Sequence, residues 1–193
     1  IVLIRKNFLI FIFMHDVIFG GYGFIGNELF KRIKNCKRYS NTRKIAKKNL
    51  IAYNEKNFSK IIRKAPKNIF YLSGISSPNF RENNHYINLL ENIKYQNLLE
   101  SAKKNKYKGR IFFFSSIAVY GSSKNEAVEK YDNLKPESHY ALSKIVGELQ
   151  SNFYSKNYNL KIINLRLCSI FGPTLKRQVI FKIFKETQNQ KKY

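Results

Sequence analysis

Short apolar runs alternate along the chain with longer segments in which apolar residues recur every three or four positions. Such alternation is typical of β-strands joined by amphipathic helices, and therefore of βαβ units arranged around a parallel sheet. The helical periodicity predicts helices over residues 24–35, 58–64, 84–106 and 139–153. The apolar runs predict six strands, at residues 16–19, within 36–49, and at 50–53, 68–73, 110–115 and 161–167.

The two longest predicted helices each carry an apolar stripe that we expect to face the core. In the first helix the stripe consists of Ile87, Leu90, Ile93, Leu98 and Ala102. In the second it consists of Ala141, Ile145, Leu149 and Phe153, spaced by four residues. The strand at 110–115 is apolar without interruption, which favours a central parallel strand covered on both faces. The sequence therefore predicts an α/β fold with helices on both faces of a parallel sheet.

A glycine-rich turn follows the first predicted strand. Residues 20–26 read Gly-Gly-Tyr-Gly-Phe-Ile-Gly, so Gly20, Gly23 and Gly26 occupy positions 1, 4 and 7. Such glycines permit a tight turn, a close approach of backbone N–H groups to a pyrophosphate, and close packing of helix on strand. The helix that begins near Phe24 and Ile25 adds the partial positive charge of its N-terminus. Because the turn joins a strand to an amphipathic helix, we expect it to bind a dinucleotide.

The segment after this loop lacks the acidic residue that usually accepts hydrogen bonds from the 2′-hydroxyl of an adenosine ribose. No Asp or Glu occurs between Glu28 and Glu55, whereas basic residues are frequent there. An arginine at this place suits a 2′-phosphate, with Arg43 or Arg38 as the candidates. We therefore favour NADP over NAD as the cofactor. The alternative is that a lysine-rich composition has obscured the second strand.

Hydroxyl and amine groups follow two later elements, at the edge of a parallel sheet where ligands bind. Ser116 ends the strand that begins at residue 110. Tyr140 and Lys144 are separated by four residues on a predicted helix, which places them on one face. A cation beside a phenol lowers the pKa of the phenol and makes it a usable acid or base. Together the three residues suggest a catalytic site.

The order of these motifs resembles the extended short-chain dehydrogenase/reductases, of the NAD(P)-dependent epimerase/dehydratase kind that acts on nucleotide sugars. The resemblance implies a Rossmann-like, doubly wound parallel sheet whose substrate-binding C-terminal domain is largely missing here. It rests on GGYGFIG at 20–26, YLSGISSP at 71–78, NLLESA at 97–102, SSIAVYG at 115–121, YALSKIVGE at 140–148 and LRLCSIFGP at 165–173.

The same resemblance assigns roles to individual residues. Tyr140 would be the catalytic acid and base, Lys144 would lower its pKa and hold the nicotinamide ribose, and Ser116 would bind the sugar hydroxyl that is oxidised. The other residues implied to bind the cofactor are Gly20, Gly23, Phe24, Ile25, Gly26, Ser73, Gly74 and Asn92. Two further readings stay open: an NADP(H)-binding reductase, and a dinucleotide-binding regulator without catalysis.

The resemblance also divides the chain. We expect residues 1–13 to be an extraneous N-terminal extension, residues 14–185 to be the NAD(P)-binding domain, and residues 186–193 to be a truncated tail. A nucleotide sugar is the expected substrate, and pairing of two copies into a homodimer stays open. The two cysteines lie far apart, and neither a disulfide framework nor a metal site is expected. We expect a cytoplasmic location.

Charge is the most unusual feature of the composition. The 193 residues include 36 Lys and Arg but only 12 Asp and Glu, which gives a formal net charge of +24. A basic surface attracts polyanions, but frequent lysine raises the charge everywhere without forming a site. No known nucleic-acid-binding motif is present, so nucleic acid is not an expected partner. No apolar run approaches the roughly 18 residues of a membrane-spanning helix, so no membrane association is expected.

Overall fold

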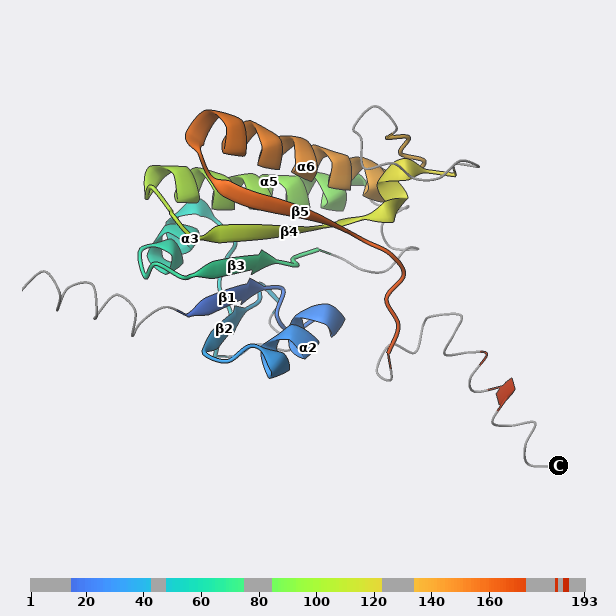
Figure 1. Ribbon diagram of the computed structural model, residues 1–193, viewed down its shortest axis with the longest axis horizontal. Coiled ribbons are helices and arrows are strands. Elements are labelled where there is room, and N and C mark those ends of the chain that lie inside the picture. Colours follow the sequence, from blue (N-terminus) through green and yellow to red (C-terminus); the bar gives the residue numbers. More distant parts are fainter. Residues whose placement is uncertain are drawn as a thin grey trace, which may run out of the picture.

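The computed structural model describes residues 15–42, 48–74, 85–122, 134–172, 183 and 186–187. These residues form a sheet of five parallel strands in the order β2-β1-β3-β4-β5 (Figure 1). The chain passes from β1 outward to β2 and then returns to the other side of β1, where the remaining strands are added. Ligands bind at this reversal of strand order in open parallel sheets. The strands are β1 (Asp16–Phe19), β2 (Cys36–Tyr39), β3 (Asn68–Tyr71), β4 (Arg110–Ser116) and β5 (Lys161–Leu167).

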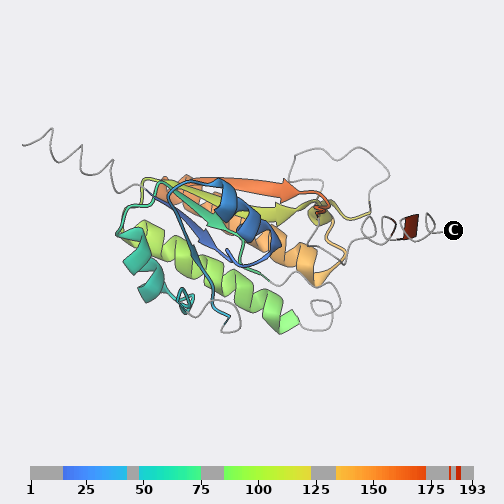
Figure 2. The same cartoon turned by 90° about the horizontal axis from the view of Figure 1, so that it is seen from below.

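Helices cover both faces of this sheet, as expected for a doubly wound Rossmann-like fold. One face carries α3, α5 and α6, whereas α2 lies on the other face against β1 and β2 (Figures 1 and 2). A short 3₁₀ helix, η1, follows β4 directly. The predicted fold class is therefore confirmed. The bounds are α2 (Phe24–Arg32), α3 (Glu55–Ile62), α5 (His85–Lys104), η1 (Ile117–Tyr120) and α6 (His139–Tyr158).

The main core lies between the sheet and the three helices on one face. Phe19 of β1 is fully buried and contacts Phe58 of α3 edge to face, with ring centroids 4.9 Å apart. Tyr95 of α5 stacks on Phe113 of β4 at 4.4 Å. Such aromatic pairs add about 0.5–1.5 kcal/mol each to the free energy gained from burial. The core therefore fixes α3 and α5 rigidly against β1 and β4.

The predicted strand at 50–53 is wrong. Only Leu50 makes a bridge, to Ser40, and residues 51–53 are not part of a strand. The physical reason lies in Tyr53, whose buried side chain reaches back to the backbone of β1 and β2. The apolar run therefore anchors a loop instead of forming a sixth strand.

The apolar stripes predicted on α5 and α6 are also partly wrong. Ile93 is 45% exposed, and Leu149 and Phe153 are both more than half exposed. The buried positions of these helices instead include polar and small residues, among them Ser151, whose Oγ lies 2.8 Å from Oη of Tyr95. Side chains that bond across the contact allow the helices to pack closely, so helical periodicity identified only part of the buried face, including Leu98, Ala102 and Ala141. No helix among the described residues is long and apolar enough to cross a membrane.

Candidate functional site

The glycine loop between β1 and α2 has the geometry that its sequence predicts. Gly20 adopts a φ of +78°, and a Cβ atom there would lie 2.8 Å from the carbonyl of Leu72. At Gly26 a Cβ would lie 2.5 Å from the carbonyl oxygen of Gly20. Gly23 precedes α2 and has no side chain to cap it, so the first N–H groups of the helix, at Phe24 and Ile25, point along its axis without intrahelical partners. This arrangement is suited to bind an anion.

Tyr53 completes the loop and was not identified from the sequence. Its Oη accepts a hydrogen bond from the backbone N–H of Gly20 at 3.0 Å and donates one to the carbonyl of Tyr39 at 3.1 Å. Burial raises the pKa of Tyr53 well above its ordinary value, so the phenol stays protonated. A single tyrosine in an apolar run gives no sequence signal for this role.

The end of β2 lies beside the loop. Ser40, the first residue after the strand, is buried, and its Oγ accepts from the backbone N–H of Thr42 at 3.0 Å. Arg38 donates to Oδ1 of Asn27 at 2.7 Å, and the rings of Tyr22 and Phe30 each lie 4.2 Å from its guanidinium carbon. Arg38 is therefore held against α2 and the loop. The other arginine candidate, Arg43, lies outside the described residues.

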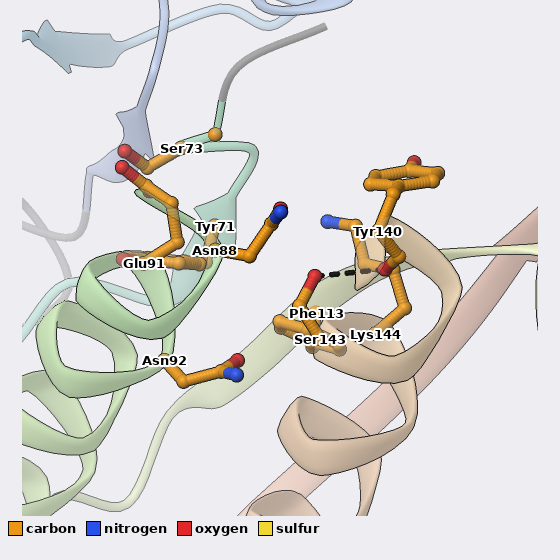
Figure 3. A pocket seen from close by; sticks show the side chains of 10 residues that line it. Tyr71, Ser73, Asn88, Glu91, Asn92, Phe113, Tyr140, Ser143 and Lys144 are labelled. Atoms are coloured by element: carbon orange, nitrogen blue, oxygen red, sulfur yellow. Dashed lines mark hydrogen bonds between the residues drawn. The ribbon is translucent and has the colours of Figure 1, made fainter. Parts of the chain in front are cut away.

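A pocket opens at the carboxyl edge of the sheet, between β3, α5 and α6 (Figure 3). It brings together five of the residues predicted from the sequence, namely Ser73, Gly74, Asn92, Tyr140 and Lys144. The pocket adjoins the glycine loop, because a Cβ on Gly20 would lie 2.9 Å from the backbone nitrogen of Ser73. The residues that the sequence did not single out are Tyr71, Asn88, Glu91, Phe113 and Ser143.

Tyr140 and Lys144 lie one turn apart at the start of α6. Ser138 caps this helix, since its Oγ accepts from the backbone N–H of Ala141 at 3.1 Å. Lys144 donates from Nζ to the carbonyl of Phe114 at 2.9 Å, and this nitrogen lies 5.6 Å from the centroid of the Tyr140 ring. The ammonium group is thus fixed beside the phenol, as the spacing of the two residues predicts.

Ser116 is placed differently from the other predicted site residues. It is outside the set of described residues that line this pocket. Its Oγ accepts from the backbone N–H of Ala118 at 3.2 Å and so caps η1. The neighbouring Ser115 is buried and donates to Oε1 of Glu148 at 2.5 Å. The role of Ser116 therefore stays a prediction.

A buried ion pair behind the pocket was also missed. Glu148, on α6 and one turn after Lys144, has no exposed surface and binds Arg166 of β5 through both carboxylate oxygens. Arg166 donates in turn to Oη of Tyr120 at 2.7 Å. The hydrogen bonds that Arg166 donates to Glu148 raise the pKa of Arg166 further, so its guanidinium stays charged. The partners are 18 positions apart, so no local pattern reveals them.

The described residues fit a dinucleotide better than a metal ion. The glycine loop leaves room for a phosphate, and two buried oxygens in the pocket, Oη of Tyr71 and Oε2 of Glu91, have no hydrogen-bond partner among the described residues. Buried polar atoms of this kind are usually satisfied by a ligand or by water. Within the described ranges, no group of three or more His, Cys, Asp or Glu side chains could hold a metal ion.

Comparison with known proteins gives partial matches among curated sequences and longer ones among solved structures. Uronate dehydrogenase of Pseudomonas syringae pv. tomato is 33% identical over 72 residues, which are 37% of this chain and 26% of that protein. Protein CapI of Staphylococcus aureus is 36% identical over 64 residues, which are 33% and 19% of the two chains. This chain thus spans about a quarter or less of these two curated relatives.

Two of the solved structures that resemble the fold are enzymes for nucleotide sugars. A double mutant of the dTDP-glucose 4,6-dehydratase DesIV from Streptomyces venezuelae, with NAD bound, has a TM-score of 0.76 at 20% identity. UDP-N-acetylglucosamine 4-epimerase from Methanobrevibacter ruminantium has a TM-score of 0.69 at 27% identity. Each match covers 92% of this chain but 63% of the solved chain.

The residues that match a protein-family model include the glycine loop, the residues that line the pocket and the parallel sheet. The model of the NAD dependent epimerase/dehydratase family matches residues 17–192, which is most of the chain. The match agrees with the loop that is suited to bind an anion and with the Tyr140–Lys144 pair at the adjoining pocket. On this evidence the chain belongs to the NAD dependent epimerase/dehydratase family.

Proposed function

We propose that this chain forms the cofactor-binding part of an NAD(P)-dependent epimerase or dehydratase that acts on a nucleotide sugar. The observation that carries the proposal is the convergence of Tyr140 and Lys144 on a pocket that adjoins the glycine loop. The dehydratase and epimerase names of the two structural relatives support the substrate class. The match to the family supports the cofactor.

In this proposal the dinucleotide extends from the glycine loop into the pocket. Gly20, Gly23 and Gly26 leave space for its pyrophosphate, and the N-terminus of α2, at Phe24 and Ile25, contributes N–H groups. Ser73, Gly74 and Asn92 line the wall beside it, and Lys144 holds the ribose next to the reacting ring. When bound, the nicotinamide supplies an acceptor for the hydride of the sugar carbon.

Tyr140 carries the proton in the reaction that we propose. Its phenolate oxygen accepts the proton of the sugar hydroxyl while the carbon loses its hydride, so that a carbonyl group forms on the sugar. The ammonium of Lys144 favours the phenolate because opposite charges attract strongly in a pocket of low dielectric constant. In this proposal Ser116, at the end of β4, binds the same sugar hydroxyl.

The cofactor preference follows from the residues at the end of β2. Ser40 stands where a ribose-binding acid is expected, and Arg38 lies beside it against the glycine loop. A carboxylate there would repel a 2′-phosphate, whereas a serine does not. We therefore expect NADP to bind more tightly than NAD, with Arg38 and Arg43 as the candidate contacts. Equal affinities in a titration of NADPH and NADH fluorescence would contradict this preference.

The experiment that tests the catalytic proposal separates binding from hydride transfer. The chain is loaded with NAD⁺ or NADP⁺, and the absorbance at 340 nm is followed after addition of UDP-glucose, UDP-N-acetylglucosamine or dTDP-glucose. The wild-type chain should produce reduced cofactor, whereas Tyr140→Phe should bind the dinucleotide with unchanged affinity and produce none. Wild-type binding without any reduction would favour the alternative, a dinucleotide-binding regulator without catalysis.

We also propose that two copies of the chain pair through the exposed side of α5 and α6. These helices lie side by side (Figure 1). Their outer surface carries large apolar residues that a monomer leaves in water. A surface of this kind is suited to an isologous contact with a second copy. The residues are Tyr86, Leu89 and Ile93 on α5, and Leu142, Leu149 and Phe153 on α6.

The proposed pairing is tested by light scattering coupled to size-exclusion chromatography. The wild-type chain should elute with twice the monomer mass of 22.8 kDa, and Leu149→Lys should elute as a monomer. Ile163→Lys is the matched control, because Ile163 is a similarly exposed apolar residue on β5. A wild-type chain that is monomeric at high concentration would refute the pairing.

A further inference from the structure

Glu91 brings a negative charge to the wall of the pocket, although no motif in the sequence singled it out. Its Oε1 accepts from Nζ of Lys94 at 2.6 Å. Its Oε2 is buried and has no hydrogen-bond partner among the described residues. A buried carboxylate oxygen without a donor destabilises the protein, because it has lost the hydrogen bonds of water. Oε2 therefore lacks one hydrogen-bond donor, which a ligand could supply.

Tyr71 adds a second polar atom to the same pocket. Its side chain is 2% exposed, and its Oη also has no hydrogen-bond partner among the described residues. Burial raises the pKa of Tyr71 well above its ordinary value, and the charge of Glu91 raises it further, whereas the nearby hydroxyl of Ser73 lowers it only in part. The phenol is therefore protonated at neutral pH and can donate a hydrogen bond. The pocket thus offers one unused acceptor and one unused donor.

The position of this pair relative to the catalytic residues is clear in Figure 3. Glu91 and Ser73 lie on one side of the pocket, and Tyr140 and Lys144 lie on the other side. The cation and the anion that line the pocket are therefore on opposite walls. A ligand that fills the pocket contacts both walls. The wall of Lys144 favours a negatively charged or hydrogen-bond-accepting group, and the wall of Glu91 favours a hydrogen-bond donor.

We propose that Glu91 and Tyr71 bind one sugar hydroxyl of the ligand, which donates to the carboxylate and accepts from the phenol. A hydroxyl has both a donor and acceptor lone pairs, whereas a phosphate offers acceptors and a negative charge that Glu91 repels. The pair therefore selects a hydroxyl-bearing sugar at this wall and excludes a phosphate from it. This inference rests on the proposed function, in which a ribose-containing dinucleotide enters the pocket.

Calorimetric titration of the full chain with NAD⁺ tests the pair. Glu91→Ala should weaken binding about 10-fold, and Tyr71→Phe about 5-fold, because each removes one hydrogen bond to the same hydroxyl. Glu91→Gln should lose only about 3-fold, since its amide oxygen still accepts. The double variant Glu91→Ala/Tyr71→Phe should bind no more than about 10-fold more weakly than wild type, because both side chains address one group. Lys103→Gln is the matched control, because Lys103 pairs with Glu100 on the same helix outside the pocket lining, and it should stay within about 2-fold.

Inorganic pyrophosphate provides the second probe, because it has no hydroxyl. Its affinity should stay equal or rise in Glu91→Ala, since a repulsive charge has been removed. Unchanged NAD⁺ affinity in both single variants, or losses that multiply in the double variant, would overturn the pair while leaving the proposed function intact. A wild-type chain that binds neither NAD⁺ nor NADP⁺ would overturn the proposed function and the inference together. Circular dichroism checks folding, and Glu91→Gln and Tyr71→Phe still carry the test if Glu91→Ala does not fold.

Discussion

The ion pair of the fully buried Glu148 and the largely buried Arg166 holds α6 on the sheet. Glu148 accepts from Oγ of Ser115 and from both Nε and Nη2 of Arg166, the latter at 2.7 Å. The Arg166 side chain is only 13% exposed. Replacing Glu148 by Ala leaves this guanidinium buried without a counter-charge. Breaking a buried pair from one side costs about 3–5 kcal/mol, so we expect a loss of stability of that size.

Replacing both partners by apolar residues separates this cost from the packing of the side chains. In Glu148→Met/Arg166→Met neither charge has to be desolvated, so the double variant should be more stable than Glu148→Ala and close to wild type. Urea denaturation followed by circular dichroism gives the free energies of unfolding. The reasoning is refuted if Glu148→Ala loses less than about 1 kcal/mol, or if the double variant is less stable than both single variants.

Three further changes test the loops around the site. Gly26→Ala places a Cβ 2.5 Å from the carbonyl oxygen of Gly20, so it should abolish dinucleotide binding in a fluorescence titration and lower the melting temperature. Tyr53→Phe removes one of the two acceptors of the Gly20 N–H, the other being the carbonyl of Tyr39, so it should cost about 0.5–1.5 kcal/mol in urea denaturation and weaken dinucleotide binding. Glu137 accepts from the N–H and the hydroxyl of Ser122, which lowers its pKa. These bonds should therefore persist at neutral pH and break only as the pH falls through the lowered pKa of Glu137. The Ser122 amide resonance in NMR should follow that transition, and a midpoint above the ordinary pKa of glutamate would contradict it.

Local patterns were sufficient for five of the six predicted strands and for the glycine loop. The loop is specified by consecutive residues, because Gly20 needs a positive φ and Gly26 needs the absence of a side chain. The pairing of Tyr140 with Lys144 follows from the helical repeat alone. These features depend only on neighbours in the sequence, and the structure reproduces them.

Features that depend on contacts between distant segments could not be predicted. Tyr53 converts an apolar run into a loop anchor because its hydroxyl reaches Gly20, which is 33 positions away. Leu149 and Phe153 look like core residues in a helical projection, yet they face outward. The side of a helix that is buried depends on what packs against it, and here hydrogen-bonded and small residues take that place.

The wall of the pocket shows how the position of one predicted residue extends to its neighbours on the same helix. The sequence predicts Asn92 as a cofactor-binding residue, and the structure places it at the pocket on α5. Positions three and four residues apart share a face of a helix, so Asn88 must line the same wall as Asn92. Glu91 lies three residues after Asn88 and joins them for the same reason. The helical repeat of α5 therefore places the carboxylate of Glu91 at the pocket, and a ligand that binds there must offer it a hydrogen-bond donor.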